Sequence, residues 1–583
     1  MAEKYNLIHE RVDDIPLLIG LAQRLRLPEI IDKQIGNHGH HQGLSNGHLT
    51  IVWLAYILSE GDHRKYSVED WAKKHQNTLE QLLSQPIREV EFNDDRLEIV
   101  LRRLSQAKAW EAMEVDLWSS TVAVYKIEMS GVRLDSTTTY GYHRPTEDGL
   151  MQYGYSKDHR LYLPQLKLMA AGAEPSGHLL CSEVLAGHKA DDPLYLPMLR
   201  RVRQTVSKSG SGSGLLYVGD SKMAAVETRA DIVAHGDYYL MPLPLTGETG
   251  MQMETWIDAV VDGEQTVDLI WDQGRLLGGG YEFERCQMAS CQMASVAAEQ
   301  VKWTERVEVI RSSSRAEGQI KQLEQRLSKA EAQLQSLTPP PGRGKRQYRE
   351  ESILQAAVAQ LLEDYKVAGL LHVTWQRQEE AITHYLGRGR GSANRPKQTD
   401  VRIRYVITAV QRDHSAIQRR RHRLGWHAQV TNLPLDKMSL AEVVIHYRGG
   451  WSLERDFHLV KDRPLGISPL YVRRDDQIIG LTHLLTLALR MLTLIETQVR
   501  SGIAQTGKQM AGLYEGQPNR KTDQPTGLRL LKAFTRGEIT LTRIELDEQH
   551  SWHITPLSDL QEQILAYLGL STSLYKRLIE NSS

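Results

Sequence analysis

The sequence predicts an α/β catalytic core interrupted by a large insertion domain, with an all-α N-terminal domain and a small C-terminal α+β tail. Residues 1–125 carry apolar residues at helical spacing, with no strand-like alternation. Residues 126–242 then follow the order three strands, helix, strand, helix. Some two hundred residues separate the end of that fourth strand from a late acidic helix, far more than an ordinary loop, so an inserted domain is required.

Composition is typical of a soluble, reduced protein with several domains. The chain has 583 residues, of which 41% are hydrophobic and 25% charged. Its net charge of -1 means that any contact with nucleic acid must come from local basic patches. Its three cysteines are too few for a disulfide framework. Cys286 and Cys291 open a tandem Cys-Gln-Met-Ala-Ser duplication without a histidine at ligand spacing, which argues against a zinc site.

We expect no signal peptide and no membrane span. The chain opens on a polar stretch, and residues 8–25 are amphipathic. The most apolar run, residues 478–495, contains His483, Arg490 and three threonines, which favours a buried helix. We therefore expect a cytoplasmic protein.

The N-terminal region, residues 1–125, should be helical throughout. Helices are predicted over residues 15–26 and 49–59, from residue 67, and from a capped start at Asn93. A cluster of His38, His40 and His41 has no cysteine or carboxylate partner nearby, which indicates a polar loop.

Two aspartates mark the predicted core of residues 126–242. Asp135 lies near the middle of a first strand at residues 131–138, and Asp220 ends a fourth strand at residues 214–221. The other predicted elements are strands at 164–170 and 178–184, helices at 191–203 and 222–234, and an edge strand at 237–240.

A third carboxylate lies on a late helix, within residues 447–461, which Ser452 could cap. Glu454 and Lys461 are seven residues apart and so share a face of this helix. A neighbouring stripe should face a core: Leu453, Phe457 and Val460. Either the two charges form a solvated pair, or the carboxylate holds a hard cation and the lysine meets a phosphate.

The predicted insertion, residues 243–400, combines strands at 256–271 and 280–284 with helices at 317–337 and 350–364. Basic patches occur in and just after it: Arg343, Lys345 and Arg346; Arg388, Arg390, Arg395 and Lys397; Arg419, Arg420, Arg421 and Arg423. Glycines between the arginines of the second patch would let the backbone follow a phosphate track. A solvated face is the alternative.

The core should resume over residues 401–504. Strands are predicted at 403–410 and 426–431, and Ser439 with Glu442 forms a capping box that opens the helix leading to Tyr447. The tail, residues 505–583, has a strand-like segment at 538–546 and a closing helix from residue 557, with no role that the residues indicate.

Aspartate on a first strand, aspartate at the end of a fourth and glutamate on a late helix is the order of carboxylates in RNase-H-like nucleotidyl transferases. The chain resembles bacterial insertion-sequence transposases of the DDE class, in the branch with a Tyr-Arg-Glu-Lys signature. Tyr447, Arg448, Glu454 and Lys461 carry that signature. In its usual form the arginine follows the tyrosine by three residues, where this chain has Gly450.

The resemblance implies an RNase-H-like core in which Asp135, Asp220 and Glu454 are catalytic and hold two Mg²⁺ ions, with Mn²⁺ as a substitute. Two such ions about 3.5–4 Å apart activate a nucleophile and stabilise the leaving oxygen. The implied reaction is cut-and-paste excision and insertion of the element, with or without a hairpinned end. The nucleophiles are water and then the freed 3′ hydroxyl.

The implied partners are double-stranded DNA, as terminal inverted repeats and target, and a second copy of the chain in the DNA complex. Tyr447 and Arg448 would position the DNA end, and Lys461 would hold a phosphate. Lys157, His159 and Arg160 would touch phosphates or form a solvated turn. The N-terminal domain would recognise the repeats or serve only for packing. Trp256, Trp271 or Trp303 would stack on a flipped base or belong to the core.

Three other functions remain open. A transposase-derived DNA-binding protein without catalysis is disfavoured because all three carboxylates and the lysine are present. A metal-dependent nuclease without strand transfer would use the same site. A small-molecule enzyme lacks support because no glycine loop for a nucleotide is seen.

Overall fold

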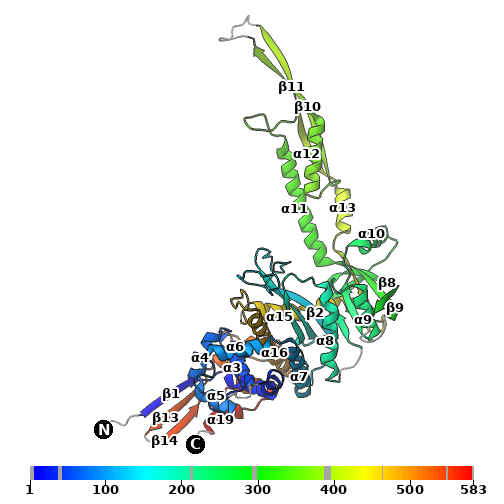
Figure 1. The fold of residues 1–583 in the computed structure, drawn as a ribbon. Coiled ribbons are helices and arrows are strands. Elements are labelled where there is room, and N and C mark those ends of the chain that lie inside the picture. The colour runs from blue at the N-terminus through cyan, green and yellow to red at the C-terminus, as the bar shows by residue number, and fades with distance from the viewer. Residues whose placement is uncertain are drawn as a thin grey trace.

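The computed structural model describes residues 5–36, 42–210, 214–291, 299–386, 396–462, 464–546 and 549–580. A helical body and a large sheet lie together, and a long arm extends away from them (Figure 1). The histidine cluster at residues 38–41 and the basic residues Arg388, Arg390 and Arg395 lie outside the described residues.

The N-terminal region is mostly helical, as predicted, but it opens on a strand. The helices are α1 (Ile15–Arg24), α2 (Leu27–Ile35), α3 (Asn46–Glu60), α4 (Lys65–Lys74), α5 (Gln76–Leu83), α6 (Asp94–Leu104) and α7 (Ala107–Tyr125). Asn93 caps α6 by accepting a hydrogen bond from the Arg96 amide, as expected. The prediction of an all-helical region is wrong for β1 (Tyr5–Arg11). That strand forms by pairing with the far end of the chain, which local periodicity does not register.

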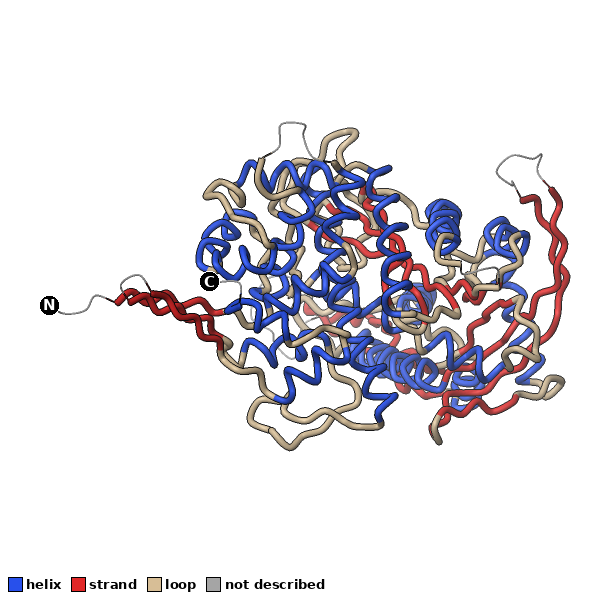
Figure 2. Tube along the Cα trace, turned by 90° about the horizontal axis from the view of Figure 1, so that it is seen from below, coloured by secondary structure: helices blue, strands red, loops and turns tan. Residues whose placement is uncertain are grey.

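The C-terminal residues belong to the same body and not to a separate tail. Strand β1 pairs antiparallel with β13 (Thr540–Leu546), which pairs with β14 (Gln549–Ile554), and this small sheet projects near the N-terminus (Figure 2). The helices α17 (Gly527–Thr535), α18 (Asp559–Tyr567) and α19 (Ser573–Glu580) contribute side chains to the core of the N-terminal helices. The Tyr575 hydroxyl donates to the carbonyl of Asp13 at 2.8 Å, which ties the two chain ends together.

A mixed nine-stranded sheet forms the centre of the molecule, in the order β4-β3-β2-β5-β6-β12-β9-β8-β7. Its strands are β2 (Gly131–Tyr140), β3 (Gln165–Glu174), β4 (His178–Ala186), β5 (Leu216–Val218), β6 (Tyr238–Pro242), β7 (Asp268–Asp272), β8 (Arg275–Cys291), β9 (Glu299–Ser312) and β12 (Trp426–Thr431). The 3-10 turn η1 (Asp192–Leu194) and the helices α8 (Tyr195–Ser207), α9 (Val226–Ala234) and α10 (Gly247–Val261) connect them.

Two boundaries predicted from the sequence differ in the structure. Strand β6 is internal, between β5 and β12, and is not an edge strand. Residue 243 is not a domain boundary, because β7, β8 and β9 extend the same sheet. The prediction of one strand over residues 256–271 is wrong for its first part, because residues 256–261 end the helix α10, in which Met253 and Ile257 recur at helical spacing and are buried. A strand, β7, begins only at Asp268.

The arm comprises α11 (Ser313–Leu337), α12 (Glu351–Asp364), β10 (Leu371–Tyr385), β11 (Lys397–Arg412) and α13 (His414–His422). It has its own small core, in which Leu323, Leu327 and Leu334 of α11 are fully buried. Strand β11 pairs only with β10, so the prediction that residues 403–410 return to the central sheet is wrong. Among the predicted strands after residue 400, β12 alone joins the sheet.

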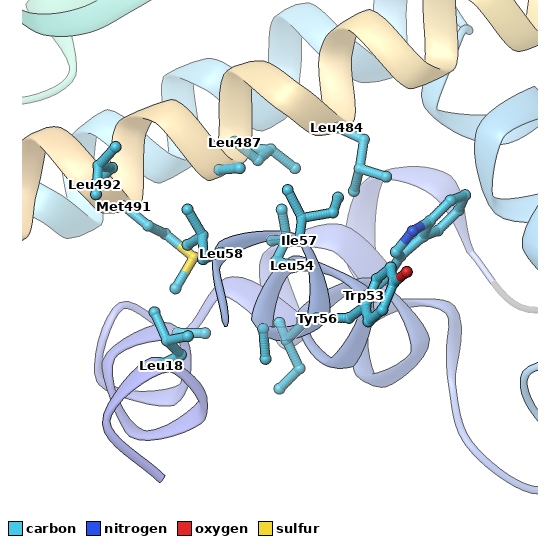
Figure 3. Packing of buried hydrophobic residues seen from close by; sticks show 14 of the residues in the cluster. Leu18, Trp53, Leu54, Tyr56, Ile57, Leu58, Leu484, Leu487, Met491 and Leu492 are labelled. Carbon is cyan, nitrogen blue, oxygen red and sulfur yellow. The ribbon is translucent and has the colours of Figure 1, made fainter. Parts of the chain in front are cut away.

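Helix α16 (Asp475–Thr506) crosses the body. It is long and apolar enough to span a membrane, but 94% of its most apolar window is buried inside the protein. Its leucines pack against α3 and α1 (Figure 3). The prediction of a buried helix at residues 478–495 is therefore confirmed. The close approach of α16 to α6 requires Gly480, since a Cβ there would lie 2.0 Å from the Leu101 carbonyl oxygen.

Glu308 on β9 should make the stability of the sheet depend on pH. Burial raises the pKa of this carboxyl to about 8, the charge of Glu282 adds to the rise, and Arg306 opposes it. A raised carboxyl pKa means that ionisation disfavours the folded state. The penalty is absent below pH 4.5, grows up to about pH 8 and then stays constant.

We therefore expect Glu308→Gln to raise the free energy of unfolding by about 4 kcal/mol at pH 8 and by almost nothing near pH 4.5. Urea unfolding at both pH values measures this. Glu282→Gln is the matched control, because Glu282 lies opposite Glu308 but is bonded to Arg306 at 2.7 Å. It should give no gain, and an equal gain in both variants would contradict the assignment.

Candidate active site

The two aspartates lie at matching positions on neighbouring parallel strands. Strand β2 pairs with β5 so that Arg133 is opposite Val218. Asp135 and Asp220 each follow that pair by two residues, so the same register places them side by side. Neighbouring strands are about 4.8 Å apart, which is a suitable spacing for two carboxylates at one site.

Asp135 is held by two partners at this edge. Lys157 donates to its Oδ1 at 3.0 Å, and so does the Ser136 amide at 2.7 Å. Burial raises the pKa of Asp135, the charge of Asp220 adds to the rise, and Lys157 opposes it. The effect of the Asp220 charge on Asp135 agrees with the register of the two residues.

Asp220 accepts hydrogen bonds at its own Oδ1 from the Tyr195 hydroxyl at 2.6 Å and from the Lys222 amide at 2.9 Å. Burial raises the pKa of Tyr195 well above its usual range, and the nearby carboxylates of Asp220 and Asp135 add to it. Tyr195 is therefore a neutral donor to Asp220, a residue that sequence inspection did not identify.

Glu454 lies on α15 (Trp451–Lys461), which follows α14 (Leu440–Arg448). The predicted seam of α15 is confirmed, since Leu453, Phe457 and Val460 are buried. The predicted capping box of α14 is also present. The predicted cap at Ser452 is wrong: the helix begins two residues earlier than that cap implies, with Gly450 as its N-cap residue and no side-chain cap. Glu454 is exposed and forms no hydrogen bond or ion pair within the described part of the chain.

Tyr447 lies within electrostatic reach of all three carboxylates. Burial raises the pKa of the Tyr447 phenol to about 12, and the guanidinium of Arg133 opposes the rise. Three negative charges add to it, those of Asp220, Asp135 and Glu454. The fields of all three therefore reach the same buried phenol.

Lys461, the lysine of the predicted signature, does not pair with Glu454. Lys461 donates to Asp158 Oδ1 at 2.6 Å, and not to Glu454. The hairpin that supplies Asp158 also supplies Lys157, and Arg160 stacks 4.5 Å from the centroid of the Tyr140 ring. His159 is exposed and adopts a positive φ of 57°. The hairpin thus meets both Asp135 and the end of α15.

Arg448 and Gly450 show how this chain differs from the usual signature. Arg448 Nη2 donates to Ser312 Oγ at 2.8 Å, at the start of α11, and so joins α14 to the base of the arm. Gly450 leaves space that Arg133 fills, since a Cβ on Gly450 would lie 1.9 Å from the Arg133 Cζ. The guanidinium of Arg133 lies 5.8 Å from the centroid of the Tyr447 ring.

Two polar residues, Glu174 and His446, hold Arg133 in place. Its Nε donates to Glu174 Oε1 at 2.7 Å, and His446 is 2.9 Å from Glu174 Oε2. Although burial acts to raise the pKa of Glu174, the bond from His446 and the charge of Arg133 lower it. Alternation along the strand could have identified Arg133, because residues two apart, such as Arg133 and Asp135, lie on the same face. The partner Glu174 could be found only from the β2–β3 pairing.

A cavity of about 570 Å³ adjoins Asp220. Tyr447, Arg448, Arg315 and His427 contribute to its wall. Burial lowers the pKa of His427 to about 4, and the charges of Arg315 and Arg448 add to the effect, so this imidazole is neutral. The tryptophans predicted as base-stacking candidates have separate settings: Trp303 is buried, Trp256 packs edge-on against Phe283, and Trp271 is exposed on β7.

A family model described as "Transposase DDE domain" matches residues 127–491. The chain belongs to this transposase family. A second model, "Domain of unknown function (DUF4277)", matches residues 7–114 of the transposase, the region of the N-terminal helices. No curated protein matches the sequence.

One similar solved structure is described as "Cryo-EM structure of piggyBac transposase synaptic complex with hairpin DNA (SNHP)". Its identity to this transposase is 10% and the TM-score is 0.25. The likeness covers 49% of this chain and 60% of that chain, less than two thirds of its length.

Transposase DDE domains generally depend on divalent metal ions. Within the described ranges, no group of three His, Cys, Asp or Glu side chains is already drawn together to hold an ion. The donor set fits a hard divalent cation, because Asp135, Asp220 and Glu454 offer carboxylate oxygens from separate elements. The matched range contains all three, together with Tyr447 and Lys461.

Proposed function

We propose that the protein is the DNA transposase of a bacterial insertion sequence, which excises and inserts its element by cut-and-paste phosphodiester chemistry. The observation that carries the proposal is the register of Asp135 with Asp220 on paired strands, inside the matched transposase domain. The strand order β4-β3-β2-β5-β6 supports an RNase-H-like core for it. It would act on DNA in the bacterial cytoplasm as a homodimer.

Asp135, Asp220 and Glu454 would hold two divalent ions, Mg²⁺ or Mn²⁺. When bound, such ions activate a water or a 3′ hydroxyl and stabilise the leaving oxygen. Lys157 now pairs with Asp135, and Lys461 pairs with Asp158. We infer that both lysines turn to DNA phosphates when a DNA end enters. Tyr447, kept neutral by its raised pKa, and Arg448 would position that end.

The arm supplies a surface of the right shape for DNA. Its β10–β11 pair is a two-stranded ribbon with mostly exposed side chains, and a ribbon of this kind fits a major groove. Lys397 lies at the distal end of β11, 5.3 Å from the centroid of the Tyr385 ring. In the sequence it follows Arg388, Arg390 and Arg395.

Changing Arg388, Arg390, Arg395 and Lys397 together to Ala should weaken DNA binding and reduce its dependence on salt. Each lost phosphate contact lowers the slope of log affinity against log salt by about 0.9. Gel-shift titrations at several salt concentrations measure the slope. A control with Glu379, Glu380 and Asp400 of the same ribbon changed to the amides should bind no more weakly. An unchanged slope in the variant that lacks the four basic residues would contradict this role for the arm.

The function itself is tested with a labelled duplex that ends in the inverted repeats flanking the gene, incubated with the protein in Mg²⁺. We expect cleavage at the repeat and joining of the labelled 3′ end to a plasmid. Cleavage without joining would identify a nuclease. Binding without cleavage in Mg²⁺ or Mn²⁺ would identify a DNA-binding protein that has lost catalysis.

A further inference from the structure

Two guanidinium groups lie on one phenol ring in the C-terminal region, outside the active site and the arm. Arg520 Cζ is 3.9 Å and Arg529 Cζ is 4.3 Å from the centroid of the Tyr514 ring. Arg529 extends from α17, and Arg520 from the loop before it. A cation–π contact contributes about 0.5–1 kcal/mol at an exposed site, so the shared ring offsets part of the repulsion between the two charges. The ring thereby holds two cations together.

Neither cation is neutralised. Arg520 Nη1 donates to the amide oxygen of Gln517 at 3.2 Å, and the Arg529 side chain makes its contact with the ring. Across the described residues, no carboxylate forms an ion pair with either guanidinium. Glu515, which follows Tyr514 in the chain, is bonded to Arg536 at 3.1 Å.

Three exposed lysines extend the positive charge around this pair. Lys508 and Lys521 line one cavity of about 700 Å³ at the end of α16, where a backbone bridge between Met510 and Thr522 joins their segments. Lys532 is one turn of α17 beyond Arg529. Within the described ranges none of the three lysines has an ion-pair partner. Asp523 lines the same cavity as Lys508 and Lys521. A second cavity, which Arg529 and Lys532 line, also contains Asp13, Asp14 and Glu60.

We propose that this C-terminal basic surface, made of Tyr514, Arg520, Arg529, Lys508, Lys521 and Lys532, binds the phosphate backbone of duplex DNA outside the active site. Paired guanidinium forks match a phosphate in two-bond geometry, and the lysines add point charges along a strand. Such contacts position a duplex without reading its sequence. The choice of DNA over another polyanion rests on the proposed function.

The test uses the full-length protein and a fluorescently labelled duplex of about 60 bp with unrelated sequence, titrated at salt concentrations of about 50–200 mM. Arg520→Ala with Arg529→Ala should lower the slope of log affinity against log salt by about 2, from two lost phosphate contacts. Affinity at the lowest salt should fall at least tenfold.

Arg64→Ala is the matched control. Arg64 also lies on a tyrosine ring, 5.4 Å from the centroid of Tyr66, but Asp62 neutralises it at 2.8 Å. Its slope should equal that of the wild type. A second variant, with Lys508, Lys521 and Lys532 changed to Ala, removes only exposed side chains and keeps the test decisive if the double variant unfolds. It should lower the slope by about 3.

An unchanged slope in a folded variant overturns the proposal, as does an equal fall in Arg64→Ala. The result stands apart from the proposed function, because all variants retain Asp135, Asp220 and Glu454. Cleavage of a repeat-ended duplex in Mg²⁺ is measured separately. Its absence in the wild type would contradict the transposase activity and leave the binding result readable.

Discussion

Glu454→Gln abolishes cleavage and strand transfer, by orders of magnitude, and leaves repeat binding and thermal stability near those of the wild type. Glutamine keeps the size of the side chain but not the charge that would hold a divalent ion. Glu454 is exposed and forms no ion pair within the described residues, so its loss should cost the fold little. Cleavage of a repeat-ended duplex in Mg²⁺, beside a gel shift and a melting curve, measures all three properties.

Two further variants separate the metal site from the phosphate contact. Lys461→Ala should weaken binding of the reacting end and slow cleavage, and added metal should not restore the rate. Asp158→Asn removes the present partner of Lys461 and should leave that lysine free for DNA, with binding at least as tight as the wild type. Full activity of Glu454→Gln would end the assignment of this residue to the catalytic set.

We expect Glu114→Gln to lower the free energy of unfolding by about 3–5 kcal/mol, because it leaves the buried guanidinium of Arg490 without a counter-ion and removes the closer partner of Arg201. Glu114 on α7 accepts from Arg490 of α16 and from Arg201 of α8, each at 2.5 Å. Glu114 is 2% exposed and Arg490 3% exposed, so water cannot replace the lost charge. This contact joins the helices that flank the central sheet.

Urea unfolding at neutral pH measures the loss. Glu183→Gln is the control, since Glu183 is 3.8 Å from the same Arg201 but has a side chain that is 37% exposed. A partly exposed pair of this kind contributes at most about 1 kcal/mol. A loss below 1 kcal/mol in Glu114→Gln would show that the three helices do not depend on this charge.

Several elements could be predicted because their signals are local. The strand at residues 131–140 follows from alternation, the box of Ser439 and Glu442 from capping chemistry, and the seam of α15 from spacing at helical period. The buried helix α16 followed from its polar residues. Each of these signals depends on residues that are close together in the chain, so it can be read from the sequence alone.

Other features arose from contacts between distant residues. Strand β1 pairs with a segment more than five hundred residues away, and β6 became internal because β12 returned beside it. Arg133 occupies the space at Gly450, and Glu174 and His446 hold it there. Periodicity indicates which face of a strand or helix is buried, but it does not indicate which partner covers that face.

By itself, the sequence indicated the identity and order of the three carboxylates, the position of Glu454 on a helix and the burial of α16. Only the tertiary structure decided that Asp135 and Asp220 share a register, that Lys157 and Lys461 bind acidic partners, and that β7, β8 and β9 extend the central sheet. The reason is physical. Local propensity acts through neighbours along the chain, whereas register, ion pairing and sheet order are chosen by the free energy of packing segments that are far apart in sequence.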